Sequence, residues 1–168
     1  ESEKGLYKTT DGGYTWSLVN NDLSDGTIKI NPYTGDVYVS KKDGIYYSSD
    51  KGENFEKIVN DTITGLDLTA QKNNKINVYY CNNNGVHISK DRKTFSKIES
   101  TSYPTTQPMN IKVSPLNSNK MIVIDRQGTY QNYPYYSTDG GKTWKKSTLS
   151  DELSFMPYNN RMSIPMWS

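Results

Sequence analysis

The sequence has little of what many catalytic and metal sites are built from. Its 168 residues include one cysteine, Cys81, and one histidine, His87. A single cysteine excludes a disulfide within the chain and a cysteine-based metal cluster, and a single histidine excludes a two-histidine metal site. We therefore expect no metal and no cofactor.

Long hydrophobic runs and an excess of one charge are also lacking. No apolar stretch approaches the roughly 18 residues of a membrane-spanning helix. The 20 basic and 18 acidic residues give a net charge of +2, and the basic residues are scattered rather than gathered in one stripe. We therefore expect neither a membrane nor a nucleic acid as partner.

The chain is rich in aromatic residues instead. Hydrophobic residues make up 33% of the sequence and the mean hydropathy is −0.84, yet aromatic residues reach 12%, with 14 tyrosines and 3 tryptophans. Aromatic and β-branched residues favour strands over helices, so the composition predicts an all-β protein. The length allows one domain or a piece of a larger one.

One short motif recurs along the chain. It occupies residues 9–16, 48–55 and 137–144, and a shortened copy without its glycine lies at 89–95. Aspartate, glycine and a hydroxyl residue are the types that close a tight turn, and short stretches of alternating apolar residues stand on both sides. Each copy therefore predicts a β-hairpin with the motif at its turn. The motif aspartates and closing aromatics are Asp11, Asp50, Asp91, Asp139, Trp16, Phe55, Phe95 and Trp144.

Two more strands are predicted before each hairpin. The first strands of the repeats are expected at 27–30, 65–68, 110–113 and 162–166, and the second strands at 36–39, 75–80 and 120–124. Each repeat therefore holds four antiparallel strands. The chain divides into a partial unit at 1–24, full units at 25–60, 61–100 and 101–150, and the start of another unit at 151–168.

Four-stranded units at a spacing of about 40–48 residues are typical of the blades of a β-propeller. The motif resembles the Asp-box, or BNR repeat, whose pattern runs Ser/Thr-x-Asp-x-Gly-x-Thr-Trp/Phe, and the resemblance covers essentially the whole chain. That superfamily includes sialidases, xyloglucanase-type glycoside hydrolases, sortilin-like receptors and photosystem assembly factors. The resemblance implies a segment of a larger propeller, with a closed four-bladed ring as the alternative.

Two aspartates stand where the resemblance implies catalysis. Asp43 and Asp125 each come just after a predicted second strand, the blade position at which the xyloglucanase-type family places a catalytic aspartate. Glycosidases need two carboxylates that face one bond. The alternative interpretation is that both are solvated turn residues or caps. The aspartates of the Asp-box lie at the opposite end of each blade, so we expect them and the closing aromatics to be structural.

Candidate substrate-binding residues gather in the longer loops and at the end of the chain. Tyrosine rings stack on the apolar faces of sugars, arginines bind carboxylates, and a tryptophan on an innermost strand reaches the channel. The alternative is that these side chains pad the loops and the core. The candidates are Tyr103, Tyr130, Tyr133, Tyr158, Arg126, Arg161 and Trp167.

Two functions are compatible with these patterns. The first is a portion of a secreted Asp-box propeller glycoside hydrolase that cleaves a polysaccharide with paired carboxylates. The second is a non-catalytic propeller that binds a protein or a glycan, as sortilin-like receptors and assembly factors do. The expected partners are a carbohydrate or protein ligand, together with the remaining blades of a larger propeller or a second copy of the chain. Two carboxylates within roughly 5–10 Å across a cleft would favour hydrolysis.

Overall fold

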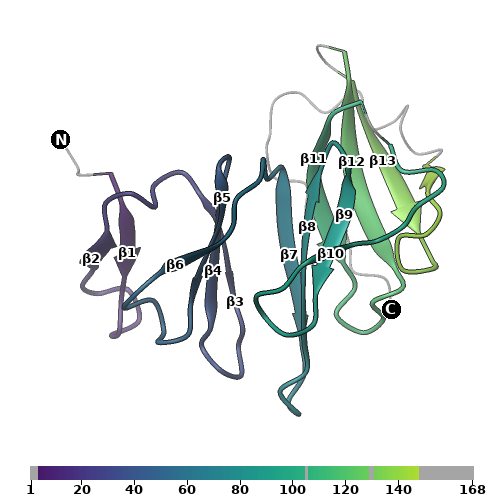
Figure 1. Ribbon diagram of the computed structural model, residues 1–168. Coiled ribbons are helices and arrows are strands. Elements are labelled where there is room, and N and C mark those ends of the chain that lie inside the picture. The colour runs from purple at the N-terminus through teal and green to yellow at the C-terminus, as the bar shows by residue number, and fades with distance from the viewer. Residues whose placement is uncertain (1–3, 105, 129–130, 148–168) are drawn as a thin grey trace.

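The computed structural model describes residues 4–104, 106–128 and 131–147. These residues form fourteen strands and no helix (Figure 1). Accordingly, the described part of the chain contains no helix able to cross a membrane. The all-β fold predicted from the composition is confirmed. The predicted strand at 162–166 and the predicted unit at 151–168 lie outside the described residues.

The strands form one hairpin and three four-stranded sheets, and each pair of neighbours in a sheet is antiparallel. The bounds of the hairpin and of the first sheet are β1 (Leu6–Lys8), β2 (Ser17–Asn20), β3 (Thr27–Ile30), β4 (Val37–Lys41), β5 (Gly44–Ser48) and β6 (Glu56–Val59). The bounds of the other two sheets are β7 (Gly65–Ala70), β8 (Ile76–Asn82), β9 (Gly85–Ser89), β10 (Ser96–Lys97), β11 (Pro108–Val113), β12 (Met121–Gln127), β13 (Gln131–Ser137) and β14 (Lys145–Lys146).

The sheets follow one another along the chain as blades do. Within each sheet the strands lie in sequence order, β3 to β6, β7 to β10 and β11 to β14. The first strand of the middle sheet, β7, contacts the first strands of both flanking sheets, β3 and β11. Figure 1 shows the hairpin and the three sheets side by side, with the hairpin and the β11–β14 sheet at the two ends. This arrangement is that of β-propeller blades.

The hydrophobic core lies between the sheets. One cluster, with Leu6 and Val39, joins the hairpin to the β3–β6 sheet. A second, with Tyr38 and Leu66, joins the β3–β6 and β7–β10 sheets, and a third joins β7–β10 to β11–β14. Burial of one large apolar side chain contributes about 1.5–3 kcal/mol, so each sheet depends on its neighbours for stability.

One carboxylate also joins the first strands of the three sheets. Asp67 on β7 is almost fully buried, and its Oδ1 lies 2.6 Å from the ammonium of Lys29 on β3. Its Oδ2 accepts a hydrogen bond of 2.8 Å from the backbone N–H of Val113 on β11. The ammonium of Lys112, also on β11, lies 4.0 Å from Oδ1. Asp67 therefore holds the inner strands of three successive blades together.

Of the two candidate catalytic residues, Asp125 departs from the expected position just after a strand. Strand β12 runs three residues past its predicted end and includes Asp125, which is paired with Tyr133 on β13. Asp43 lies in the short turn between β4 and β5. Asp125 is thus a strand residue on a buried position, and only Asp43 is a turn residue.

Candidate functional site

The carboxylate oxygens of the Asp-box aspartates accept hydrogen bonds from groups of their own turns. Oδ1 of Asp50 accepts hydrogen bonds from the Ser48 hydroxyl at 2.7 Å and from the backbone N–H groups of Glu53 and Asn54 at 3.0 and 2.9 Å. Asp139 accepts from the backbone N–H and the hydroxyl of Thr143 at 2.9 and 2.6 Å. Hydrogen bonds from the threonine lower the pKa of Asp139 to about 2. These carboxylates are ionised and hold the turn.

The same pattern recurs at the other two copies. Asp11 bonds to the backbone N–H and hydroxyl of Thr15, which lower its pKa to about 2. At Asp91, bonds from the backbone N–H and side chain of Thr94 lower the pKa. None of the four aspartates therefore offers a proton near neutral pH.

The closing aromatics have different environments. Trp144 is 5% exposed and meets the ring of Tyr103 edge-on at 5.8 Å between centroids. Phe55 and Phe95 are half-buried and pack against the sheet that precedes their own. Trp16, by contrast, is 60% exposed. The indole N–H nevertheless bonds within its own turn in both tryptophans, to Gly13 and to Gly141.

Asp43 is an exposed carboxylate with two close partners. Its Oδ2 lies 2.9 Å from the ammonium of Lys57 and accepts a hydrogen bond of 2.7 Å from the hydroxyl of Tyr46. The hydrogen bond from Lys57, followed by that from Tyr46, lowers the pKa of Asp43 to about 2. A general acid that works near neutral pH needs a raised pKa, so Asp43 is unsuited to that role.

Asp125 is fully buried and holds a loop. Its Oδ1 accepts a hydrogen bond of 2.7 Å from the backbone N–H of Gln107, and its Oδ2 accepts one of 3.3 Å from the side chain of Gln127. The β7–β10 sheet stands between the sheet that carries Asp43 and the sheet that carries Asp125. The structure therefore does not bring the two carboxylates together as a pair.

The two described tyrosines of the predicted substrate-binding set, Tyr103 and Tyr133, lie in different environments. Tyr103 packs into the core between the second and third sheets, and its hydroxyl donates a hydrogen bond of 3.1 Å to the carbonyl of Asn82. Burial raises the pKa of Tyr103, and its ring is not available for stacking on a sugar. Tyr133 lies on β13, with the ammonium of Lys146 at 3.3 Å from its ring centroid. Tyr130, Tyr158, Arg161 and Trp167 lie outside the described residues.

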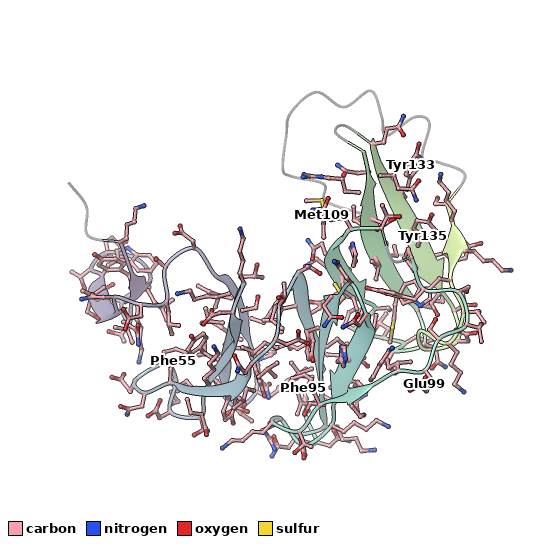
Figure 2. The ribbon with its side chains drawn as sticks, turned by 45° about the horizontal axis from the view of Figure 1, so that its top comes forward. Phe55, Phe95, Glu99, Met109, Tyr133 and Tyr135 are labelled. Atoms are coloured by element: carbon pink, nitrogen blue, oxygen red, sulfur yellow. The ribbon has the colours of Figure 1, made fainter. Side chains whose placement is uncertain are left out.

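Polar side chains gather at the end of the β12–β13 hairpin. These two strands have seven residues each, whereas β4 and β5 have five each. The amide of Gln127 donates to the hydroxyl of Tyr135 at 3.0 Å, and the hydroxyl of Tyr133 donates to Gln131 at 2.9 Å. Figure 2 shows Met109 near this end and Phe55 and Phe95 toward the opposite one.

We call this region the hairpin surface and define it by Met109, Arg126, Gln127, Gln131, Tyr133 and Lys146. Arg126 pairs with Asn132 and therefore lies on the opposite face of the hairpin from Gln127, Gln131 and Tyr133. Arg126 and Tyr133 were among the predicted site residues, whereas Met109, Gln127, Gln131 and Lys146 were not. Gln131 and Tyr133 alternate along β13, and that alternation was visible in the sequence. Lys146 comes from another strand, so its place over the Tyr133 ring required the fold.

A second polar cluster lies at the loop between the first and second sheets. Oδ2 of Asp61 accepts hydrogen bonds from the side-chain amide of Asn82 at 2.8 Å and from the hydroxyl of Tyr80 at 3.3 Å. The ring of His87 stacks on Tyr80 at 4.4 Å between centroids, and its Nδ1 is buried without a hydrogen-bond partner. Burial lowers the pKa of His87, so the imidazole is neutral at neutral pH.

Comparison with solved structures shows the same fold in a GH74 enzyme. The crystal structure of an ancestral GH74 enzyme is 16% identical and has a TM-score of 0.64, with 88% of this chain and 22% of that chain covered. The chain thus spans about a fifth of the length of that enzyme. YCF48 from Cyanidioschyzon merolae is 14% identical with a TM-score of 0.43, and 86% of this chain and 66% of that chain are covered.

YCF48 bound to D1 peptide is 13% identical with a TM-score of 0.36, and 88% of this chain and 63% of that chain are covered. No curated protein matches the sequence. A family model for the BNR/Asp-box repeat matches residues 7–18, at the first motif. The Sortilin-Vps10 model, described as sortilin, neurotensin receptor 3, matches residues 43–160, which is more than half of the chain. The chain therefore belongs to the Sortilin-Vps10 family and carries Asp-box repeats on β-propeller blades.

Proposed function

We propose that this part of the propeller is a non-catalytic binding module that takes a polypeptide ligand on the hairpin surface. The observation that carries the proposal is the state of the two candidate catalytic carboxylates. Asp43 is ion-paired with Lys57, Asp125 is buried under its own loop, and a whole sheet stands between them. The description of the family names a receptor, neurotensin receptor 3, which agrees with ligand binding rather than catalysis.

The edge of β13 favours a polypeptide over a glycan as the ligand. β14 pairs with Tyr135 and Tyr136, and the N–H of Ser147 bonds to the carbonyl of Pro134 at 2.8 Å, so among the described residues no strand pairs with Gln131 or Tyr133 on the side away from β12. An open strand edge presents backbone N–H and C=O groups that an extended peptide can pair with. Arg126, on the other face of the same hairpin, supplies a cation for an acidic group of the peptide, because an extended peptide presents side chains to both faces.

Hydrolysis of a polysaccharide is the alternative function, and it predicts a different result. The likeness to the GH74 enzyme supports the fold, at 16% identity.

We further propose an extracellular location, in agreement with the resemblance to secreted Asp-box propellers. The remaining blades of a larger propeller, or a second copy of the chain, are proposed to cover the exposed face that carries Trp16.

The experiment selects peptides from a phage-displayed random library on the purified chain and measures their affinity by calorimetry. Tyr133→Ala and Arg126→Ala each remove one group of the hairpin surface and are expected to weaken the selected peptides at least about tenfold. Lys142→Gln is the matched control, because Lys142 is exposed at an Asp-box turn. Binding that survives both variants would contradict the proposal. Xyloglucan hydrolysis by the wild type that Asp43→Asn and Asp125→Asn abolish would establish the alternative.

A further inference from the structure

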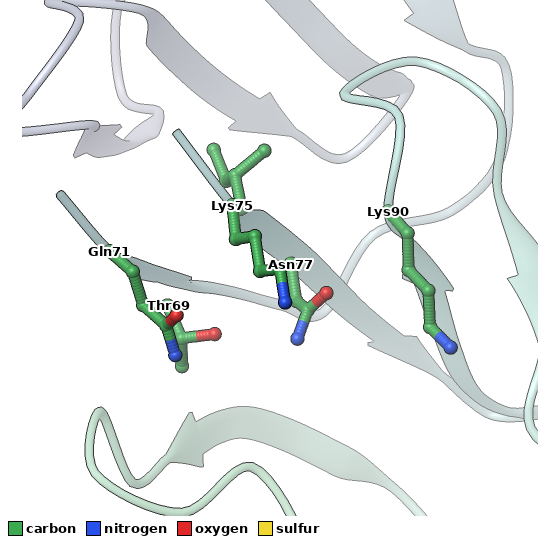
Figure 3. Close-up of a pocket in the computed structure, with 6 residues that line it drawn as sticks. Thr69, Gln71, Lys75, Asn77 and Lys90 are labelled. Carbon is green, nitrogen blue, oxygen red and sulfur yellow. The ribbon is translucent and has the colours of Figure 1, made fainter. Parts of the chain in front are cut away.

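A cavity of about 390 Å³ opens at the Asp-box end of the β7–β10 sheet, away from the hairpin surface (Figure 3). It lies beside the loop that joins β7 to β8 and the turn that follows β9. Its volume falls at the lower end of the range of small-molecule sites, about 300–1,000 Å³. The lining residues are Thr69, Gln71, Lys75, Ile76, Asn77 and Lys90.

The lining carries two positive charges and no negative one. Lys75 and Lys90 are the charged residues of the cavity, and in the described part of the chain neither forms an ion pair. Two uncompensated ammonium groups at one cavity favour an anionic ligand, because no protein carboxylate competes for them.

The neutral lining is held in place from within the sheet. Tyr79 is buried, which raises its pKa, and the side chains of Asn77, Ser118 and Thr69 lie beside its hydroxyl. Thr69 is nearly buried as well, so this part of the lining is packed against the sheet. In Figure 3 the ends of Thr69 and Gln71 lie together, those of Lys75 and Asn77 lie together beside them, and Lys90 stands apart on the other side.

This combination points to one ligand chemistry. A hydroxyl and two side-chain amides are suited to the hydroxyl groups of a sugar. The two lysines are suited to a carboxylate. We propose that the cavity binds a small polyhydroxylated carboxylate of the uronic acid type, either free or as the unit at the end of an acidic glycan.

The test is an NMR titration of the ¹⁵N-labelled chain with three probes: glucuronate, glucose and acetate. Glucuronate has both the carboxylate and the hydroxyl groups, glucose lacks the charge, and acetate lacks the hydroxyl groups. We expect glucuronate to shift the amide signals of residues 69–77 and of Lys90, and to bind at least about tenfold more tightly than either other probe. Raising the salt from about 50 to about 500 mM NaCl should weaken glucuronate and leave glucose unchanged.

Variants connect the binding to the cavity. The double substitution Lys75→Gln and Lys90→Gln is expected to weaken glucuronate at least about tenfold and to make its affinity equal to that of glucose. Lys142→Gln is again the matched control and should change nothing, since Lys142 lies at the Asp-box turn of the next sheet. Both lysines of the double variant are exposed, so an unchanged amide spectrum outside the cavity will show that the fold is intact.

Other outcomes overturn the proposal. Equal affinities for glucuronate and glucose, or glucuronate shifts that the double variant leaves in place, would show that the two lysines do not recognise a carboxylate. Shifts confined to the hairpin surface would place the site elsewhere. An oligosaccharide ending in glucuronate, added as a fourth probe, separates the two sources: tighter binding than free glucuronate indicates a glycan end, and weaker binding indicates the free acid.

Discussion

Replacement of Asp67 should be among the most destabilising single changes on the inner strands. Asp67→Ala leaves the buried N–H of Val113 without its acceptor, which costs about 1–3 kcal/mol. It also removes the partner of Lys29, whose side chain is 22% exposed and can turn toward water, so that loss adds only about 1 kcal/mol. We therefore expect the free energy of unfolding to fall by about 2–4 kcal/mol.

Asp67→Asn separates the two contributions. The amide oxygen can still accept the hydrogen bond from Val113, whereas the charge facing Lys29 is gone. We expect a loss of about 1 kcal/mol, close to the ion-pair part alone. The assay is urea unfolding followed by tyrosine and tryptophan fluorescence, with comparison at equal m-values so that the change reflects stability. A loss below about 1 kcal/mol for Asp67→Ala, or equal losses for both variants, would refute the reasoning.

The ion pair between Lys29 and Asp67 also makes the free energy of unfolding depend on pH. Burial alone would lower the pKa of Lys29, but the hydrogen bond to Asp67 and the charge of that carboxylate outweigh burial, and the pKa is raised above 10.5. A raised pKa in the folded state means that the stabilisation is complete below pH 10.5 and is lost as the pH rises through the folded-state value. The difference in stability between wild type and Asp67→Asn should therefore shrink above that pH. A difference that stays constant would contradict the assignment to Lys29.

Three further predictions concern single residues. Because burial lowers the pKa of His87 below 6.5, stability should fall as the pH drops below 6.5, and His87→Gln should remove that dependence in thermal melts between about pH 7.5 and 5. Asp61 and Lys97 also face His87, and their opposite effects leave this direction unchanged. Gly65→Ala would place a Cβ 2.7 Å from the backbone nitrogen of Ile111, so it should lower the melting temperature by several degrees. Burial raises the pKa of Cys81 to about 11, so iodoacetamide should label this thiol at about pH 8 only in urea.

The Asp-box turns could be predicted from the sequence because their bonds are local. In the second copy the hydroxyl of Ser48 accepts from the N–H of Gly52, and Asp50 accepts from residues three and four places further on. Asn54 stands where the pattern has threonine, yet its side chain still bonds to Asp50 at 2.8 Å. Every partner lies within one turn, so the residue types at fixed spacing specify the geometry.

The candidate site was harder to predict because its residues depend on distant partners. Tyr103 was expected at the surface, but it bonds to Asn82 and packs on Trp144, both in other strands or turns. Asp125 was expected after a strand, but it takes a buried position inside β12 because the N–H of Gln107 compensates its charge. The predicted strand ended at Ile124, before this charged residue, and only the distant partner of Asp125 explains its place inside the strand.

In the two Asp-box tryptophans, the hydrogen bond within the turn and the burial of the ring have different causes. Trp16 and Trp144 form the same indole bond within the turn, yet one is 60% exposed and the other 5%. The turn is therefore specified by the motif alone, whereas burial of its aromatic depends on a sheet on the preceding side. The loops that join second to third strands lie at the other end of each blade, and there β12 and β13 are two residues longer than β4 and β5. Because the turn and the blade contacts do not involve those loops, they can change length and chemistry without loss of the fold, and differences in function among Asp-box propellers are expected there.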